Sequence, residues 1–460
     1  MKRLGILALA LLVTTAVLGD PLQFSGSVRV RAENWSFFET TGFDDEYLFG
    51  AALLRASLTQ RVNPSFDWQV ELAAPILRGL PDRAVAPAPR GQLGLGGSYF
   101  AANGDTDPAS IFPKQAFVRF RRGAHSIRAG RFDFNEGAEV TPKNASLAAV
   151  KNARIPQRLI GAFGFSHVGR SADGLHYVFN TPSLNVTAVA FTPTVGAFNT
   201  DGLGEVDDVG LVYGAVTRSG ANDDARVFVI GYRDDRDIVK TDNRPAAARA
   251  TDFGDIRVST IGAHYLRAFG NANVLAWIAL QGGDWGLLEH RASAIALEGG
   301  YDFARDRKVR VGLFASSGDD DPNDGEHGTF FQVLPTPRIY ARFPFYNAMN
   351  STDAFVQFSM KPHAKVTLTS ELHGLKLTEE RDLWYAGGGA FEDRSFGFAG
   401  RPANGNDDLA RVLDVSVDYA MNPKTSFGAY AGIAKGGDVV DAIFGDDSAS
   451  FVYLEVTRRF

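Results

Sequence analysis

The chain has 460 residues, with 49 glycines, 35 phenylalanines and no cysteine, and its formal net charge is -6 at pH 7. The lack of cysteine excludes a disulfide scaffold, a redox dithiol and a cysteine-ligated metal site. The mild acidity and the absence of a basic tract argue against a nucleic-acid-binding protein.

The first residues have the pattern of a secretory signal peptide. Lys2 and Arg3 form the charged start, an apolar run covers residues 4–18, and Val17-Leu18-Gly19 resembles a cleavage site. The run is shorter than the ~20 residues of a membrane-spanning helix. We therefore expect a signal peptide at 1–19 and a single mature domain at 20–460.

From Phe24 onward, short segments alternate between apolar and polar side chains. Such alternation gives a β-strand one apolar face and one polar face. Several segments are close to the ~9–11 residues that cross a bilayer as a tilted strand. The sequence predicts an all-β transmembrane antiparallel up-and-down barrel of about 18 strands, at 24–37, 47–62, 65–73, 113–122, 125–133, 173–180, 183–192, 206–218, 224–233, 256–268, 272–284, 288–302, 307–316, 351–361, 363–375, 409–420, 424–434 and 449–460.

The connections between these strands alternate between short and long. The short ones are rich in Asn, Pro and Gly, which suit tight turns. Short turns on the periplasmic side and long loops outside are typical of an outer-membrane barrel. We predict long extracellular loops at 74–112, 134–172, 317–350 and 376–407, and short turns such as 62–65, 122–124, 180–183, 361–363 and 421–424.

The last strand, at 449–460, has no later partner and ends in Phe460. An even number of strands returns it to the side where the first strand begins, so we expect the two to close the barrel. A C-terminal strand ending in Phe is also the signal that the barrel-assembly machinery reads in outer-membrane barrels. We therefore expect that machinery as a partner, recognised through Phe460.

Arginine outnumbers lysine 36 to 11, and in many strands it lies on the parity opposite the aliphatic residues. A lipid-facing Arg at the membrane midplane would cost ~2–4 kcal/mol, so stability alone directs such residues to the lumen. A guanidinium also binds carboxylates bidentately, which suits a basic ladder for acidic solutes. Both interpretations remain open, because lumen acids such as Glu33, Asp67 and Glu71 could pair with these arginines. The pore-lining candidates from parity are Arg29, Arg31, Arg55, Arg119, Arg128 and Arg310.

The stretch 115–191 carries a family resemblance. It reads QAFVRFRRGAHSIRAGRF, then a long loop, then GRSADGLHYVF and SLNVTAVAF. It resembles the alginate-export family of outer-membrane porins, in which a strand ends in Gly-Arg and a later strand starts with Arg-x-x-Asp-Gly. The matching positions are Gly130-Arg131 and Arg170, Asp173, Gly174.

The resemblance implies an eighteen-stranded barrel with an electropositive constriction that passes polyuronate, and it adds Arg131, Arg170 and Asp173 to the candidates. It also implies a plug formed by the loop at 74–112 and a long periplasmic turn that closes the base. The turn 421–424 is too short to do this. Arg131 shares the parity of lipid-facing Ile127, so it reaches the lumen only if Gly130 forms a bulge or the strand ends there.

We therefore expect an outer-membrane channel that passes anionic polysaccharide or oligosaccharide by diffusion, without enzymatic activity, cofactor or metal. The expected partners are the anionic saccharide and the outer-membrane lipid and lipopolysaccharide, while periplasmic export partners stay undefined. The first alternative is a general or small-anion porin of the same fold.

The second alternative is an outer-membrane barrel enzyme. Residues 164–169 resemble a nucleophile elbow around Ser166, but the second Gly comes one residue late. No histidine pair has the spacing of a metal-binding helix. The acidic stretch 319–326 is interpreted as a solvated loop, with divalent bridging to lipopolysaccharide as an alternative.

Overall fold

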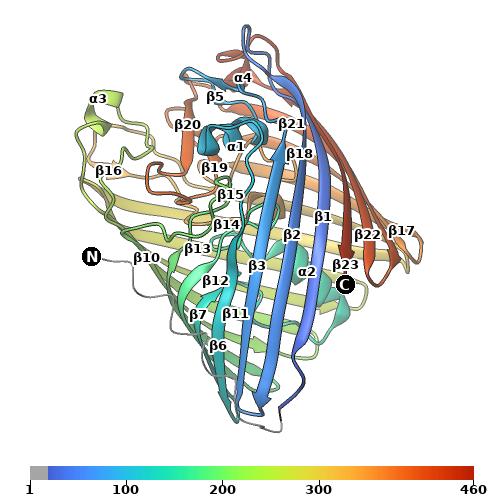
Figure 1. Ribbon diagram of the computed structural model, residues 1–460. Helices are drawn as coiled ribbons and strands as arrows, with labels where there is room; N and C mark the ends of the chain where they lie inside the picture. The colour runs from blue at the N-terminus through green and yellow to red at the C-terminus, as the bar shows by residue number, and fades with distance from the viewer. Residues whose placement is uncertain (1–18) are drawn as a thin grey trace.

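The structure is a computed structural model that describes residues 19–460, apart from the side chain of Ile339. The expected signal peptide therefore lies, except for Gly19, outside the described residues. Eighteen long antiparallel strands form one closed barrel (Figure 1). They are β1 (Gln23–Ser36), β2 (Glu46–Asn63), β3 (Phe66–Arg78), β6 (Phe112–Arg122), β7 (His125–Phe132), β8 (Ala172–Asn180), β9 (Leu184–Pro193), β10 (Val209–Ser219), β11 (Asp223–Asp234), β12 (Ile256–Phe269), β13 (Ala272–Trp285), β14 (Leu288–Ala304), β15 (Arg307–Ser316), β17 (Thr352–His363), β18 (Val366–Lys376), β21 (Asp408–Asn422), β22 (Thr425–Gly436) and β23 (Ser448–Arg459).

The remaining elements lie in the long connections. Two short hairpins pair β4 (Val85–Ala86) with β5 (Gly91–Gln92) and β19 (Leu383–Gly387) with β20 (Phe398–Pro402). β16 (Glu326–His327) runs parallel to the start of β14. The helices are α1 (Leu95–Asn103), α2 (Ala145–Arg154), α3 (Ala246–Arg249), α4 (Asp438–Asp441) and the 3₁₀ turn η1 (Pro337–Ile339). Within residues 19–460, no helix is long and apolar enough to cross a membrane.

The barrel closes between its first and last strands, as predicted. β1 pairs with β23 in a regular antiparallel register that runs from Ser27↔Arg459 to Ser36↔Ser450. The backbone N–H of Phe460 donates to the oxygen of Gly26 at 3.0 Å. Because every long strand has two neighbours, the sheet exposes no edge to lipid.

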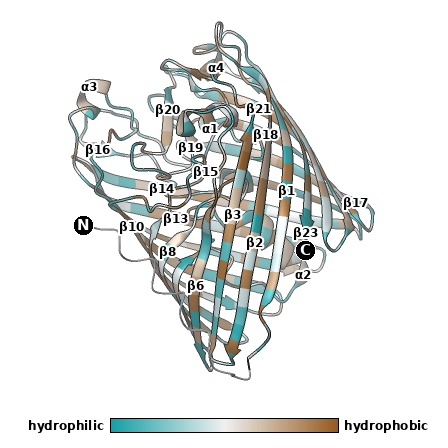
Figure 2. Ribbon diagram, in the orientation of Figure 1, coloured by the Kyte–Doolittle hydropathy of each residue, from teal (hydrophilic) through white to brown (hydrophobic). Residues whose placement is uncertain are grey.

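The two faces of the wall follow the predicted period of two. Val30, Leu54, Val311 and Leu313 are each at least 44% exposed on the outer surface, whereas Arg31 on the opposite parity is 3% exposed. Hydrophobic and hydrophilic colours alternate along β1, β2 and β3 in Figure 2. This outer band suits the hydrocarbon of a bilayer.

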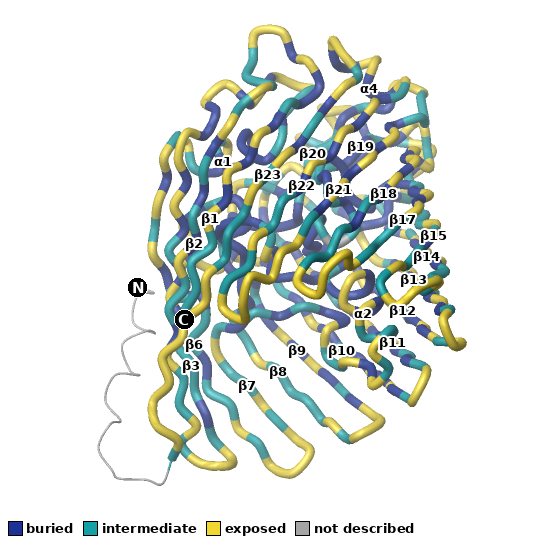
Figure 3. Tube along the Cα trace, turned by 90° about the vertical axis from the view of Figure 1, so that its right-hand side faces the viewer, coloured by how far each residue is buried: buried dark blue, intermediate teal, exposed yellow. Residues whose placement is uncertain are grey.

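The lumen is filled largely by the long connections. Buried aromatic side chains such as Trp35, Phe38 and Trp384 pack together in the barrel, and a second cluster contains Leu147, Trp277 and Phe331. In Figure 3 the exposed segments are mainly the turns and loop tips, together with short stretches along the strands. The core of this protein therefore lies inside the barrel.

One inserted connection reaches from one end of the barrel to the other. It leaves β7 at the extracellular end, forms α2, and returns to β8. The Asn144 side chain caps α2 by accepting from the N–H groups of Ser146 and Leu147. It also donates to Asn222, in the short turn between β10 and β11, at 3.0 Å. The helix thus occupies the periplasmic half of the lumen, while α1 of the 79–111 connection lies near the mouth (Figure 1). The family resemblance implied instead that the loop at 74–112 would plug the mouth and that a long periplasmic turn would close the base.

Candidate pore constriction

Two cavities meet at a short segment of the inserted connection, residues 163–166. Phe163 and Phe165 line an outer cavity of about 250 Å³, which also contains Arg338. Gly164 and Ser166 line an inner cavity of about 360 Å³. Residues 163–166 therefore separate the extracellular part of the lumen from the part nearer the periplasm.

Two wall arginines of β1 hold this segment in place. Arg29 donates to the oxygen of Gly164 at 2.8 Å and also to that of Ser166. Arg31 donates to the oxygen of Phe165 at 3.1 Å, and its guanidinium carbon lies 4.1 Å from the Phe165 ring centroid. Strand parity puts both side chains in the lumen, where they reach the backbone oxygens of this segment.

Acidic side chains partly neutralise these two arginines. The Arg31 guanidinium lies 2.6 Å from Glu455 and 3.0 Å from Glu33. Arg29 is farther from Glu455, at 3.8 Å. The charge of Arg31 is therefore paired with acids of the wall. Among the acids of the described chain, Arg29 has only the longer contact with Glu455, and it lines the inner cavity.

Arg338 of η1 faces the same point from the opposite side. Its guanidinium carbon lies 4.5 Å from the ring centroids of both Phe165 and Tyr430, and it donates to the Tyr453 hydroxyl at 3.1 Å. No carboxylate lies within 4.0 Å of it among the described residues, and its buried Nη1 has no hydrogen-bond partner. Cation–π contacts therefore hold a guanidinium that has no acidic partner in the described chain.

The inner cavity has an excess of positive charge. Four basic side chains, Arg29, Arg55, Lys114 and Arg459, line it against the two acids Asp133 and Glu455. Arg55 and Lys114 each lie 3.2 Å from Asp133, and Arg55 also pairs with Glu71, which does not line the cavity. A small solute in this cavity meets a basic surface even though the whole chain is acidic.

Comparison with known proteins gives the family and the fold type of this barrel. A family model described as alginate export matches residues 21–452, nearly the whole chain. The chain belongs to the alginate export family. No curated protein matches it. Family and fold together identify a porin-type channel of the bacterial outer membrane.

Solved structures with a similar fold are outer-membrane channels of low sequence identity. Pseudomonas aeruginosa OccK9 (OpdG) is 10% identical, with 96% of this chain and 98% of that chain covered and a TM-score of 0.59. Acinetobacter baumannii OccAB1 is 11% identical, with 95% and 97% covered and a TM-score of 0.57. P. aeruginosa OccK8 (OprE) is 8% identical, with 97% and 99% covered and a TM-score of 0.56. At this identity the likeness concerns the fold alone.

Two other predicted arginines of this alginate-export-family barrel line the lumen between β6 and β8. Arg119 pairs with Asp67 at 2.9 Å. Arg128 lies 4.2 Å from the Phe132 ring centroid and 2.9 Å from the Nδ1 atom of His176. Across residues 19–460, no carboxylate lies within 4.0 Å of Arg128. Neither residue lines one of the two cavities at residues 163–166.

Arg310 and Arg170 bind the connections that fold into the lumen. Arg310 shares the buried Glu298 carboxylate with Arg154 and Arg158, at 3.3, 3.1 and 3.2 Å. Arg170 is buried, and it donates to the oxygens of Ala390, Pro335 and Gly388. Burial lowers the pKa of Arg170 to about 9. Both guanidiniums fasten loops and face neither of the two cavities.

Arg131 and Asp173 lie on the other face of the wall. They are register partners in β7 and β8 and form an ion pair at 2.5 Å. They share the parity of Ile127 and Leu175, which are 48% and 57% exposed. The β7 pairing continues through Gly130 without a register shift. Because no bulge turns them inward, their position differs from the pore-lining place that the resemblance implied.

Arg338 and Lys114 were not among the predicted site residues. Lys114 shares the parity of the outward-facing Phe120, and it reaches the lumen only because the pairing of β3 with β6 shifts register beside it, so alternation could not have indicated it. Arg338 sits on a loop, where no periodicity tells which way a side chain points. In the sequence, only the high arginine content pointed to further lumen arginines such as Arg338.

The Ser166 hydroxyl is used within its own turn. It accepts hydrogen bonds from the backbone N–H groups of Val168 and Gly169, at 3.3 and 2.8 Å. Among the hydrogen bonds of the described chain, none joins this hydroxyl to a side-chain base. The neighbouring His167 instead has its Nε2 atom 3.3 Å from Glu33. These contacts position the constriction segment.

Proposed function

We propose that this channel passes an anionic polysaccharide or oligosaccharide, an alginate-like polyuronate, by diffusion along its basic lumen. The observation that carries the proposal is the four-to-two excess of basic over acidic side chains in the inner cavity, together with Arg338 at the constriction. Family membership supports a saccharide acid as the solute class.

The mechanism is electrostatic. Basic side chains in a low-dielectric passage raise the local concentration of anions. Arg338 lines the outer cavity without a carboxylate partner among the described residues, and it binds a uronate carboxylate there because a guanidinium offers several donors in one plane. Phe165, Tyr430 and Tyr453 hold that plane at the edge of the passage.

Release depends on the same residues. Glu455 and Asp133 already lie within ion-pair distance of Arg29 and Arg55. An entering carboxylate competes with these acids, so each site binds weakly and the solute moves on to the next. Arg29, Arg55 and Arg338 form the proposed path, with Arg119 and Arg128 as further lumen cations.

The experiment measures block of chloride current through single channels in a planar bilayer. Oligouronate should block at concentrations where a neutral oligosaccharide of equal length does not. Arg338→Gln should weaken uronate block about tenfold, because one charge-assisted hydrogen bond contributes ~1.5 kcal/mol or more.

The matched control is Arg291→Gln, which removes a guanidinium that is 64% exposed on the outer parity of β14. It should leave block unchanged. Equal block by neutral and acidic sugars would contradict the proposal. Chloride permeation without uronate block would favour a small-anion porin of the same fold.

A further inference from the structure

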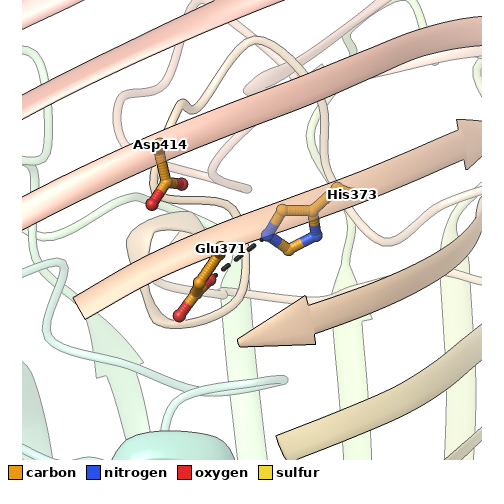
Figure 4. Close-up of side chains that lie close together, drawn as sticks. All are labelled: Glu371, His373 and Asp414. Atoms are coloured by element: carbon orange, nitrogen blue, oxygen red, sulfur yellow. Dashed lines mark hydrogen bonds and ion pairs between the residues drawn. The ribbon is translucent and has the colours of Figure 1, made fainter. Parts of the chain in front are cut away.

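A second cluster of chemically active side chains lies in the lumen wall between β17, β18 and β21. Glu371 and His373 come from β18, and Asp414 is the register partner of Glu371 on β21. Figure 4 shows the three side chains grouped between the two strands. One donor atom from each lies within 4.8 Å of the other two, and all three residues are buried.

The orientation of the imidazole is fixed from one side. The Nδ1 atom of His373 lies 3.0 Å from both oxygens of Asp353. A carboxylate only accepts hydrogen bonds, so Nδ1 carries a proton. The other nitrogen, Nε2, lies 3.2 Å from the Oε2 atom of Glu371.

Two acceptors now face one buried space. In the neutral imidazole, the Nε2 lone pair would point at the Glu371 carboxylate, which requires a positive occupant between them. The buried Oδ1 atom of Asp414 also has no hydrogen-bond donor. An added proton on Nε2 satisfies Glu371 and leaves Asp414 unsatisfied, whereas a divalent cation satisfies both.

We propose that Glu371, His373 and Asp414 bind one divalent transition-metal cation of the zinc type. One imidazole nitrogen and two carboxylate oxygens are ligands that zinc accepts, and solvent can complete a fourth position. Asp353 supplies the carboxylate–histidine support that orients such a ligand. This proposal does not depend on the solute that the channel carries.

The surrounding contacts leave the correct atoms available. The Oε1 atom of Glu371 accepts from Gln357 and lies 3.8 Å from Arg342, so its Oε2 atom remains for the metal. Metal–ligand bonds of about 2.1 Å need donor atoms about 3.4 Å apart. A side-chain rotation of Asp414 would close the remaining gap, since no donor holds its Oδ1 atom and its Oδ2 atom accepts only a 3.4 Å hydrogen bond from Tyr430. Arg342 is the one guanidinium within 4.0 Å of these carboxylates in the described chain.

The experiment titrates Zn²⁺ into the folded, chelator-treated protein in detergent at constant pH, by calorimetry. One strong site is expected, and X-ray absorption at the zinc edge should report one imidazole together with oxygen ligands. His373→Gln and Asp414→Asn should each weaken binding at least tenfold. Asp353→Asn should weaken it about 10- to 100-fold, as for other residues that orient metal ligands.

Matched controls are His363→Gln and Asp418→Asn, which change an exposed histidine and an exposed acid of the neighbouring strands. Both should bind Zn²⁺ like the wild type. Absence of a strong site, or binding that Asp414→Asn leaves unchanged, would overturn the proposal. If His373→Gln fails to fold, the absorption spectrum of the wild type decides, because a shell without imidazole would also refute it.

Discussion

At the scale of residues, the same guanidinium group performs two tasks in this barrel. Arg31 and Arg310 are buried with carboxylates and fasten the wall and the loops. Arg338 is held by aromatic rings at the outer cavity and has no acidic partner among the described residues. The partner that surrounds an arginine, more than its position on the wall, therefore decides whether it can meet a solute.

We predict that His167 makes the constriction sensitive to acid. Burial lowers its pKa to about 4, against about 6.5 for a free histidine, while Arg29, Arg31 and Glu33 face it. Above pH 6.5 the imidazole is neutral whether the segment is docked or not, so docking costs nothing. As the pH falls from 6.5 toward 4, the undocked segment gains a proton that the docked one does not, and docking weakens. Lowering the pH from 7.5 to 5 should raise single-channel conductance and noise.

The control for this prediction is His167→Gln, which should respond less to acid. Other loop carboxylates titrate in the same range, because burial raises the pKa of Asp382 to about 7 and of Asp319 to about 6. Those two groups favour the docked mouth as the pH falls, since the folded state then binds more protons. The difference between variant and wild type is therefore the quantity to compare, and identical responses would refute the role of His167.

At the scale of elements, the stability of helix α2 depends on its contacts with the barrel wall. Ten residues are too few for a stable isolated helix. Lys151 pairs with Asp224 of β11 at 2.7 Å, and Arg154 and Arg158 share Glu298 of β14. Ion pairs to the wall therefore keep this connection inside the lumen.

Glu298→Gln should release α2. It leaves three buried guanidiniums without their carboxylate, and breaking a buried pair costs ~3–5 kcal/mol. We expect trypsin to cleave within 151–158 and the conductance to rise. Glu289→Gln on the same strand breaks an exposed pair with Arg291 and should cost less than ~1 kcal/mol. Trypsin resistance of Glu298→Gln equal to that of the wild type would contradict the anchoring role.

At the scale of the whole molecule, closure joins the two ends of the described chain. The Phe460 ring packs 5.9 Å from that of Phe24. A Cβ atom added at Gly26 would lie 2.5 Å from the Phe460 ring and 2.7 Å from the backbone oxygen of Arg55. The last residue therefore fits a space that only glycine leaves on β1.

Gly26→Val should weaken closure by ~1–3 kcal/mol, the usual cost of overpacking. The measurement is urea unfolding of the protein in lipid vesicles. Gly50→Val on β2 is the control, because a Cβ atom there meets nothing within 4 Å. Equal stability of the two variants would show that the contact between β1 and Phe460 is not needed for closure.

The barrel could be predicted from the sequence because its information is local. A period of two and the alternation of turns and loops define strands, faces and closure. The interior could not be predicted in the same way. The position of α2, the contacts of Arg170 and the aromatic setting of Arg338 arise from loops that fold back between distant strands. Arg131 would turn inward only through a bulge at Gly130 or at the end of the strand, and the β7 pairing instead continues through Gly130 without a register shift.

We propose that the lumen selects anions through its arginines. The most direct measurement is the reversal potential of the wild-type channel in a planar bilayer under a KCl gradient, followed by titration with oligouronate. The basic-pore account predicts anion selectivity that falls as uronate occupies the lumen. Cation selectivity, or anion selectivity that uronate leaves unchanged, would contradict it.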